Sequence, residues 1–208
     1  MTWIKYCGCT SWSDVALAID AGANAVGMIF APSPRRVTPE AVREIALRLP
    51  ESVEPVGVFV DPSPQDLEAA LALLPRMSVQ FSGGEAPELV ARFGERAIKA
   101  IHVSEGAGTA ALQAACAPFP AARVLFDTAA SGLAGGTGRS FAWDVVAPIA
   151  RARAVVVAGG LTAENVASCV RAVRPFGVDT RSGIESAGRK DLGKMRAFRD
   201  AVRAADAA

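Results

Sequence analysis

Residues 154–160 read AVVVAGG, and residues 176–183 read FGVDTRSG. Each stretch begins with a short apolar run and reaches glycine, which is typical of a buried parallel strand followed by a tight turn. Glycine lets backbone N–H groups approach an anion. Residues 162–165, Thr-Ala-Glu-Asn, predict the N-cap of a helix whose positive end faces the same place. Two such turns in succession favour a phosphate site, with plain strand-to-helix turns as the alternative.

The same alternation of strand-like and helical segments fills the chain. Strand-like runs are expected at residues 3–6, 25–30, 54–60, 77–81, 97–102, 122–127, 154–158 and 176–179. Helices are expected at residues 15–19, 41–49, 67–74, 86–92, 109–115, 143–150, 162–173 and 190–204. The first three have start signals at Ser13-Asp14, Thr38-Pro39-Glu40 and Ser63-Pro64.

Eight strands and eight helices divide the 208 residues into units of 26 residues each (208/8). That length is close to the smallest unit that makes a right-handed crossover between parallel strands. The predicted fold is therefore α/β, a single (β/α)8 TIM barrel over residues 1–208. In such barrels the active site lies at the carboxyl ends of the strands, and phosphate is commonly bound after strands seven and eight.

The composition limits the kinds of partner. Lys and Arg number 22 against 21 Asp and Glu, so a net charge of +1 gives no broad field for nucleic acid or an anionic membrane. With four scattered cysteines, no CxxC pair and one histidine, we expect a reducing cytoplasm and no metal site. No stretch reads as an export signal or a membrane span. The expected partner is a small molecule.

Two strand ends carry groups suited to acid–base chemistry. Alternation along the first strand puts Lys5 and Cys7 on one side, toward the barrel interior if Tyr6 faces the helices. The Lys5 ammonium could then lower the pKa of the thiol toward neutrality and make Cys7 a base or nucleophile. Asp127 ends the sixth strand, where it could act as a general acid. The alternatives are a buried thiol that only packs and a carboxylate that caps a turn.

The loop after Asp127 is the longest Gly-rich segment. Residues 128–139 contain four glycines and connect the sixth strand to the next helix. A loop of this length in so short a chain is a candidate ligand loop or lid, with a merely flexible connection as the alternative.

At this point the sequence resembles a known family, phosphoribosylanthranilate isomerase of tryptophan biosynthesis. The resemblance rests on motifs that follow one another over nearly the whole chain: KYCGCT at 5–10, GANAVGMIF at 22–30, PSPRRVTPE at 32–40, VGVFV at 56–60, VQ at 79–80, LFDT at 125–128, GGTG at 135–138, FAW at 141–143, AGGL at 158–161, ENV at 164–166, RPFGVD at 174–179 and SGIE at 182–185.

The resemblance implies a cofactor-independent Amadori rearrangement of N-(5-phosphoribosyl)anthranilate to 1-(2-carboxyphenylamino)-1-deoxyribulose 5-phosphate. It implies that Asp127 protonates the ribose ring oxygen and that Cys7 takes the C2 proton. Arg36 matches an arginine that pairs with the anthranilate carboxylate, which its planar fork suits; otherwise it is an ordinary surface charge. Asp179 matches a residue that positions the sugar or the anthranilate nitrogen. The implied phosphate-binding residues are Gly136, Gly138, Gly159, Gly160, Ser182 and Gly183.

Two departures from the family pattern affect the site. Where the family usually reads Gln-Leu-His-Gly, this chain has Ser82 in the histidine position, and a hydroxyl cannot carry a proton near neutral pH. Arg181 stands where relatives are small or neutral. It could bind the phosphate, or it could pair with Asp179 or Glu185. His102 is not expected to replace the missing histidine; an exposed or core position is expected for it instead.

Other functional classes stay open on the sequence alone. The chain could be a related phosphosugar isomerase of histidine biosynthesis, although that family has an aspartate where this chain has Cys7. It could also be a diverged barrel that binds a phosphorylated metabolite without turnover. The expected assembly is a monomer or a homodimer.

Overall fold

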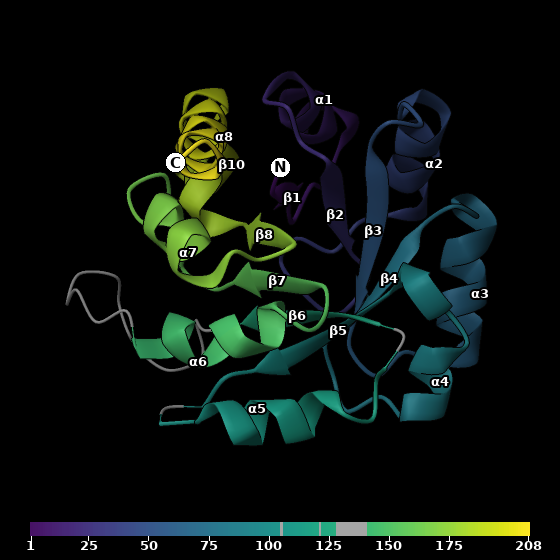
Figure 1. Cartoon of the computed structure of the whole chain (residues 1–208). Coiled ribbons are helices and arrows are strands. Elements are labelled where there is room, and N and C mark those ends of the chain that lie inside the picture. The colour runs from purple at the N-terminus through teal and green to yellow at the C-terminus, as the bar shows by residue number, and fades with distance from the viewer. Residues whose placement is uncertain (105, 121, 128–140) are drawn as a thin grey trace.

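A closed barrel of eight parallel strands forms the centre of the structure (Figure 1). The computed structural model describes residues 1–104, 106–120, 122–127 and 141–208. Each strand pairs with the next along the chain, and β8 pairs with β1 to close the ring. The strands are β1 (Trp3–Tyr6), β2 (Ala25–Ile29), β3 (Glu54–Phe59), β4 (Ser78–Phe81), β5 (Ala97–His102), β6 (Arg123–Asp127), β7 (Val155–Ala158) and β8 (Gly177–Thr180). The predicted TIM barrel is confirmed.

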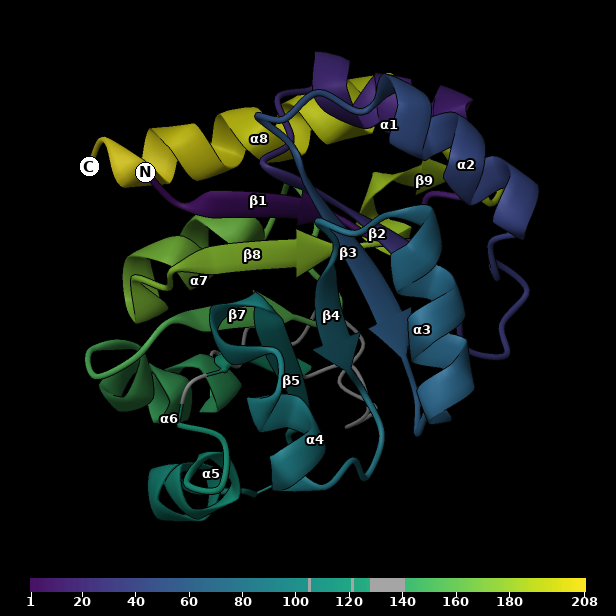
Figure 2. The ribbon, with the colours of Figure 1, turned by 90° about the vertical axis from the view of Figure 1, so that its right-hand side faces the viewer.

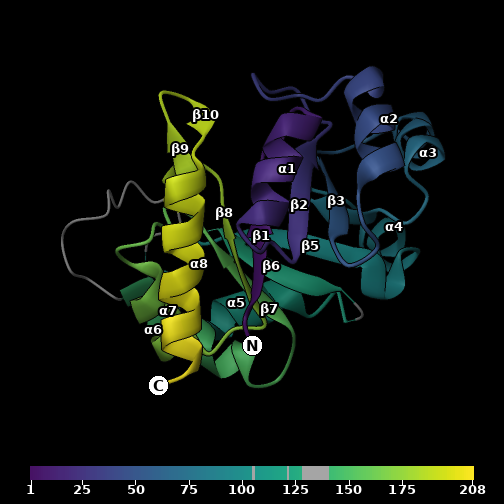
Figure 3. The same cartoon turned by 90° about the horizontal axis from the view of Figure 1, so that it is seen from above.

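Helices surround the barrel, and Figure 3 shows α8 lying beside α1 on the outside. They are α1 (Trp12–Asp20), α2 (Pro39–Arg48), α3 (Pro64–Leu73), α4 (Pro87–Ala91), α5 (Thr109–Cys116), α6 (Phe141–Ala150), α7 (Val166–Val173) and α8 (Leu192–Asp206), with 3-10 turns η1 (Gly94–Arg96) and η3 (Ser182–Ile184). The two termini lie together (Figure 2), because the backbone N–H of Thr2 donates to Asp206 at 2.9 Å. None of the described helices is long and apolar enough to span a membrane.

Three predicted helix starts are confirmed and one is wrong. Thr38 and Ser63 cap α2 and α3 with their side chains, each followed by proline. The first helix instead begins at Trp12 and is capped by Ser11, since Asp14 is bonded back to Thr10 and lies within the first turn. At residues 162–165 the N-cap of α7 is Asn165, as the sequence predicts, but the helix begins only at Val166. The Asn165 side chain holds the preceding turn, since it accepts from the backbone N–H of Thr162 and donates to the carbonyl of Gly160.

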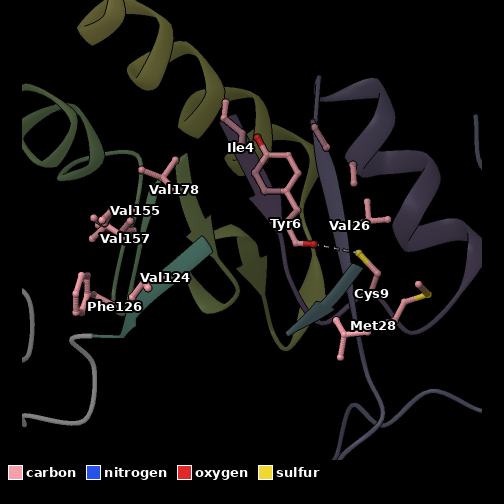
Figure 4. Packing of buried hydrophobic residues seen from close by; sticks show 14 of the residues in the cluster. Ile4, Tyr6, Cys9, Val26, Met28, Val124, Phe126, Val155, Val157 and Val178 are labelled. Carbon is pink, nitrogen blue, oxygen red and sulfur yellow. Dashed lines mark hydrogen bonds between the residues drawn. The ribbon is translucent and has the colours of Figure 1, made fainter. Parts of the chain in front are cut away.

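The strands bury both faces, so the molecule has an inner and an outer core. Small and branched residues fill the barrel interior, among them Ala25, Val56, Ile98, Leu125 and Val156. The outer faces pack against the helices, and Figure 4 shows Tyr6 and Val178 pointing outward from neighbouring strands. The Tyr6 hydroxyl donates to the carbonyl of Met195 on α8 at 2.7 Å. This alternation places the side chains of residues 5 and 7 on the inside, as the sequence predicts.

An ion pair holds the amino-terminal end of the barrel, away from the strand ends expected to carry chemistry. Arg123 of β6 binds Glu54 of β3 with both of its terminal nitrogens, and Ser78 of β4 donates to the same carboxylate. Burial alone would raise the pKa of Glu54, but the hydrogen bonds and charge of Arg123 outweigh it, and the pKa is lowered overall.

We predict that Phe198→Ala lowers the free energy of unfolding by about 3–5 kcal/mol, the usual cost of emptying a buried aromatic site. Phe198 of α8 is fully buried and packs edge-on against Tyr6, with ring centroids 6.1 Å apart. Leu47→Ala on α2, where the side chain is 88% exposed, serves as the control and changes the free energy little. Urea unfolding followed by circular dichroism measures both. Equal effects for the two variants would contradict the packing described.

We predict that Glu54→Gln weakens the dependence of stability on pH in the acid range. A carboxylate with a lowered pKa stabilises the fold above its unfolded pKa of about 4.3, and this contribution is lost as the pH falls through the folded value. The wild type should therefore lose more stability than Glu54→Gln between about pH 5 and pH 3. Glu44→Gln, at an exposed site on α2, is the control. Parallel curves for all three proteins in urea unfolding would show that the Arg123 contact contributes nothing.

Candidate active site

The carboxyl ends of the strands surround a cavity of about 320 Å³, called the mouth cavity below. Most of the site residues predicted from the sequence line it, from five different strands or the loops after them. They are Cys7, Ser82, Asp127, Gly159, Gly160, Asp179, Arg181 and Ser182. Residues that are far apart in the sequence are thus brought to one place, as expected of a barrel active site.

Cys7 follows β1 and lies at the base of this cavity with 7% of its surface exposed. Its backbone N–H donates to the carbonyl of Thr180 at 2.9 Å, which fixes it against β8. Gly27 of β2 makes room for the thiol: a Cβ atom there would lie 2.9 Å from the Cys7 Sγ and 3.0 Å from the Lys5 Nζ. The two side chains therefore converge over the same glycine.

Lys5 is fully buried beneath Cys7 and forms an ion pair with Asp179. The Nζ of Lys5 donates to Oδ1 of Asp179 at 3.1 Å, and the two residues are register partners on β1 and β8. Burial alone would lower the pKa of Lys5, but Asp179 and Cys7 raise it above its ordinary value. Lys5 therefore stays protonated and presents a fixed positive charge to the thiol.

The expectation that Lys5 brings the pKa of the Cys7 thiol toward neutrality is wrong. Burial raises the pKa of Cys7, the charge of Lys5 offsets only part of that effect, and Asp179 adds to the rise. The sequence places Lys5 correctly but gives no measure of how far both groups lie from water. By contrast, Cys9 lies outside the mouth cavity, and burial raises its pKa to about 12.

Asp127 ends β6 and lines the mouth cavity together with Cys7. In the ring of strands, β7 and β8 separate β6 from β1 on one side and β2 to β5 on the other. The carboxylate and the thiol therefore approach the cavity from well-separated parts of its wall. Asp127 is half-buried, so it reaches the cavity without being sealed in the core.

The turns after β7 and β8 form one wall of the mouth cavity. Thr180 donates to the carbonyl of Leu161 at 2.7 Å, and a Cβ atom on Gly183 would lie only 2.0 Å from the same oxygen, so only glycine fits there. Gly160 has a φ of +62°, and the space beside its α-carbon is open. The two turns predicted from the sequence thus lie together. Gly136 and Gly138 fall outside the described residues.

Arg181 lines the mouth cavity but pairs with neither of the carboxylates considered for it. Asp179 accepts from Lys5, and Glu185 accepts from Arg35 and Lys190. The aliphatic part of the Arg181 side chain packs beside Gly8, 3.3 Å from the position of a Cβ atom there. The sequence suggested that Arg181 binds the phosphate or pairs with Asp179 or Glu185. The pairing is therefore wrong, and Arg181 remains part of the cavity wall.

Arg36 does not line the mouth cavity in this structure. It is exposed and belongs to a neighbouring groove of about 410 Å³, floored by Phe30 and Phe59, whose rings stack at 4.8 Å. Asp66 lines the same groove. The groove and the mouth cavity share the lining residues Ala31, Pro32 and Val60. These residues therefore separate Arg36 from the other predicted site residues.

A buried network that sequence reasoning missed connects three loops around the cavity. Lys190 donates to the carbonyl of Cys7 and to Glu185, and Glu185 also accepts from Arg35 at 2.6 Å. Glu185 and Lys190 belong to a short hairpin of β9 (Glu185–Ser186) and β10 (Arg189–Lys190), whose turn has Ala187 and Gly188 at positive φ. Strands of two residues leave no periodic pattern, and only the Ala-Gly pair could have indicated the turn.

Two more side chains that the sequence did not indicate, His102 and Gln80, line the mouth cavity. His102 ends β5 and is exposed, as expected, yet it lines the mouth cavity. The rule that selected Cys7 and Asp127, a chemical group at a strand end, could have selected it too. Gln80 of β4 donates to the Ser82 hydroxyl at 3.2 Å, and its buried Oε1 accepts no hydrogen bond from any described residue. Ser82 therefore belongs to a polar pair rather than standing alone.

Comparisons with known proteins agree with this geometry. Residues 4–201 match the model of the family N-(5'phosphoribosyl)anthranilate (PRA) isomerase. The N-(5'-phosphoribosyl)anthranilate isomerase of Desulforudis audaxviator is 42% identical over 198 residues, which cover 95% of this chain and 96% of that protein. The crystal structure of phosphoribosyl anthranilate isomerase from Thermotoga maritima superimposes with a TM-score of 0.86 at 35% identity, covering 98% of this chain and 100% of the other.

A second solved structure adds a bound ligand. It is a phosphoribosyl anthranilate isomerase in complex with reduced 1-(o-carboxyphenylamino)-1-deoxyribulose 5-phosphate, with a TM-score of 0.83 at 33% identity, covering 98% of this chain and 100% of that one. The family match, the identity over nearly the full length and the shared barrel agree, and this chain belongs to the phosphoribosylanthranilate isomerase family.

Proposed function

We propose that this protein isomerises N-(5-phosphoribosyl)anthranilate to 1-(2-carboxyphenylamino)-1-deoxyribulose 5-phosphate, a step of tryptophan biosynthesis. The observation that carries the proposal is that Cys7 and Asp127 line one cavity with the glycine turns of β7 and β8. The cavity thus offers a base, an acid and an anion-binding wall to one small substrate. Membership of the family supports the same substrate.

Asp127 is the general acid in this proposal. Its carboxyl group protonates the ribose ring oxygen, the C1–O bond breaks, and the anthranilate nitrogen shares the positive charge as an iminium ion. Asp127 suits this role because it ends β6 at the cavity, where its half-buried carboxyl group faces the space for the substrate.

Cys7 is the base that takes the C2 proton, which leaves an enolamine that tautomerises to the ketone. The buried thiol resists ionisation, and the fixed ammonium of Lys5 favours the thiolate when it forms. The iminium charge on the substrate makes the C2 proton more acidic at the same step. Lys5 therefore supports the base, and Asp179 holds Lys5 in place. Asp179 also faces the cavity, where it positions the sugar or the anthranilate nitrogen.

The phosphate and the carboxylate anchor the two ends of the substrate. The backbone around Gly159, Gly160, Ser182 and Gly183 binds the phosphate, with the Arg181 guanidinium adding charge from the cavity wall. Gly136 and Gly138 are proposed to complete this cradle. Arg36 binds the anthranilate carboxylate, which requires its side chain to turn from the neighbouring groove across the shared wall.

The remaining parts of the proposal follow from the same chemistry. Acid–base catalysis at two side chains calls for no metal or cofactor. The partner is the phosphosugar substrate, with no role for nucleic acid or a membrane. We place the protein in the cytoplasm as one catalytic domain over residues 1–208, acting as a monomer or a homodimer.

We predict that Cys7→Ser and Asp127→Asn each lower kcat by orders of magnitude while substrate binding changes little, because each removes a proton-transfer group rather than an anchor. Steady-state turnover of phosphoribosylanthranilate by purified protein, with no added metal or nucleotide, measures this. Cys9→Ala is the matched control, since this thiol lies two residues away and outside the cavity. If both site variants kept near wild-type turnover, the assignment of acid and base would be wrong. Binding without turnover by the wild type would instead indicate a metabolite-binding barrel.

We predict that Ser82→His preserves or raises turnover. Ser82 lines the mouth cavity beside Gln80, where an imidazole can hydrogen-bond the substrate at least as well as a hydroxyl. The same turnover assay measures the variant, with Ser82→Ala as the control for loss of the hydroxyl alone. Complete loss of activity in Ser82→His, with the fold intact by circular dichroism, would show that the pocket has reorganised around serine.

A further inference from the structure

His102 and Asp127 are neighbours at the mouth of the barrel. They are register partners on the parallel strands β5 and β6, which lie about 4.8 Å apart. The pairing continues past them, because the backbone N–H of Val103 donates to the carbonyl of Asp127 at 3.1 Å. Register partners on parallel strands point to the same side, and both side chains line the mouth cavity. The imidazole therefore stands on the strand next to the proposed acid.

The two side chains differ in their access to water. His102 is exposed, whereas Asp127 is half-buried. Imidazole is the side chain best suited to gain and lose a proton near neutral pH, and this chain contains one histidine. The imidazole thus has freer access to water than the carboxyl group on the neighbouring strand.

No other described group at the cavity fits a role between Asp127 and water. Asp179 is paired with Lys5, the guanidinium of Arg181 only donates hydrogen bonds, and Cys7 is the proposed base. On β5 itself, Lys99 is directed elsewhere: its Nζ donates to Glu85 at 2.8 Å and to the carbonyl of Gly83 at 2.6 Å. The β4 residues at the cavity, Gln80 and Ser82, carry no titratable group.

We propose that His102 is a proton-relay residue that returns a proton to Asp127 in each catalytic cycle; this inference rests on the role of Asp127 in the proposed function. Asp127 gives its proton to the ring oxygen and becomes a carboxylate. The imidazolium of His102 then donates its N–H proton to that carboxylate, and the neutral imidazole takes a proton from water. Cys7 releases the proton that it took from C2, so the cycle neither consumes nor produces protons overall.

Imidazole rescue tests the relay. We expect His102→Ala to lower kcat at least about tenfold with little change in KM, since the relay acts on proton return rather than on binding. Imidazole added to the assay should restore much of the lost kcat, because the alanine leaves space at an exposed site. His102→Gln should show the same loss without rescue, because its side chain fills that space and cannot carry a proton. Wild type and Asp127→Asn with imidazole are the controls, and neither should gain activity.

Several outcomes would overturn the relay. One is a wild-type kcat in both His102 variants. Another is a failure of added imidazole to raise the kcat of His102→Ala. Full activity of His102→Gln would show that the side chain only packs or donates a hydrogen bond. Circular dichroism and binding of the product confirm that each variant folds. The Asp127→Asn control separates the two claims: if it is inactive while the His102 variants are normal, only the relay fails, whereas full activity of Asp127→Asn removes the acid itself.

Discussion

The pairing of β1 with β8 is the constraint on which the rest of the structure depends. It closes the barrel, and its register puts Lys5 opposite Asp179, whose ion pair of 3.1 Å lies buried beneath Cys7. Two charges in such a place are tolerated only together; removal of one partner from a buried pair typically costs about 3–5 kcal/mol. Closure of the barrel and the proposed chemistry therefore depend on one contact, because the ammonium that pairs with Asp179 also faces the Cys7 thiol. Gly27 completes the arrangement by leaving space for both side chains.

The amino-terminal end of the barrel carries a stabilising ion pair, and the carboxyl end carries the candidate site. At the amino-terminal end, Glu54, Ser78 and Arg123 bind one another across three strands. At the carboxyl end, the strands deliver groups that face a cavity: a thiol, a carboxylate, an imidazole and a guanidinium. The network of Arg35, Glu185 and Lys190 holds the loops after β1, β2 and β8 around that cavity. Such a frame keeps Asp127 and Cys7, the proposed acid and base, at fixed and well-separated places on the wall, which proton transfer requires.

Much of the fold could be predicted from the sequence because β-branched runs and proline-led caps are local signals. Every barrel strand begins and ends within one residue of the prediction, and Thr38 and Ser63 start their helices as expected. Within residues 162–165, the position at which α7 starts could not be predicted, because residues 162–164 form a turn that the Asn165 side chain holds. Among the candidate site residues, those at strand ends were predicted to face one cavity, and Cys7, Asp127 and Asp179 do so. Burial of Cys7, the partners of Glu185, and the position of Arg36 in a neighbouring groove depend on packing between distant segments, which no local pattern reveals.

Complementation tests the central claim most directly: that this barrel turns over phosphoribosylanthranilate through Cys7 and Asp127. A tryptophan auxotroph that lacks only this isomerase would be supplied with the chain and plated without tryptophan. The account predicts growth with the wild-type chain and none with a chain in which Cys7 and Asp127 are both replaced, at equal levels of soluble protein. Failure of the wild type to support growth at that level, or growth with the doubly substituted chain, would contradict it.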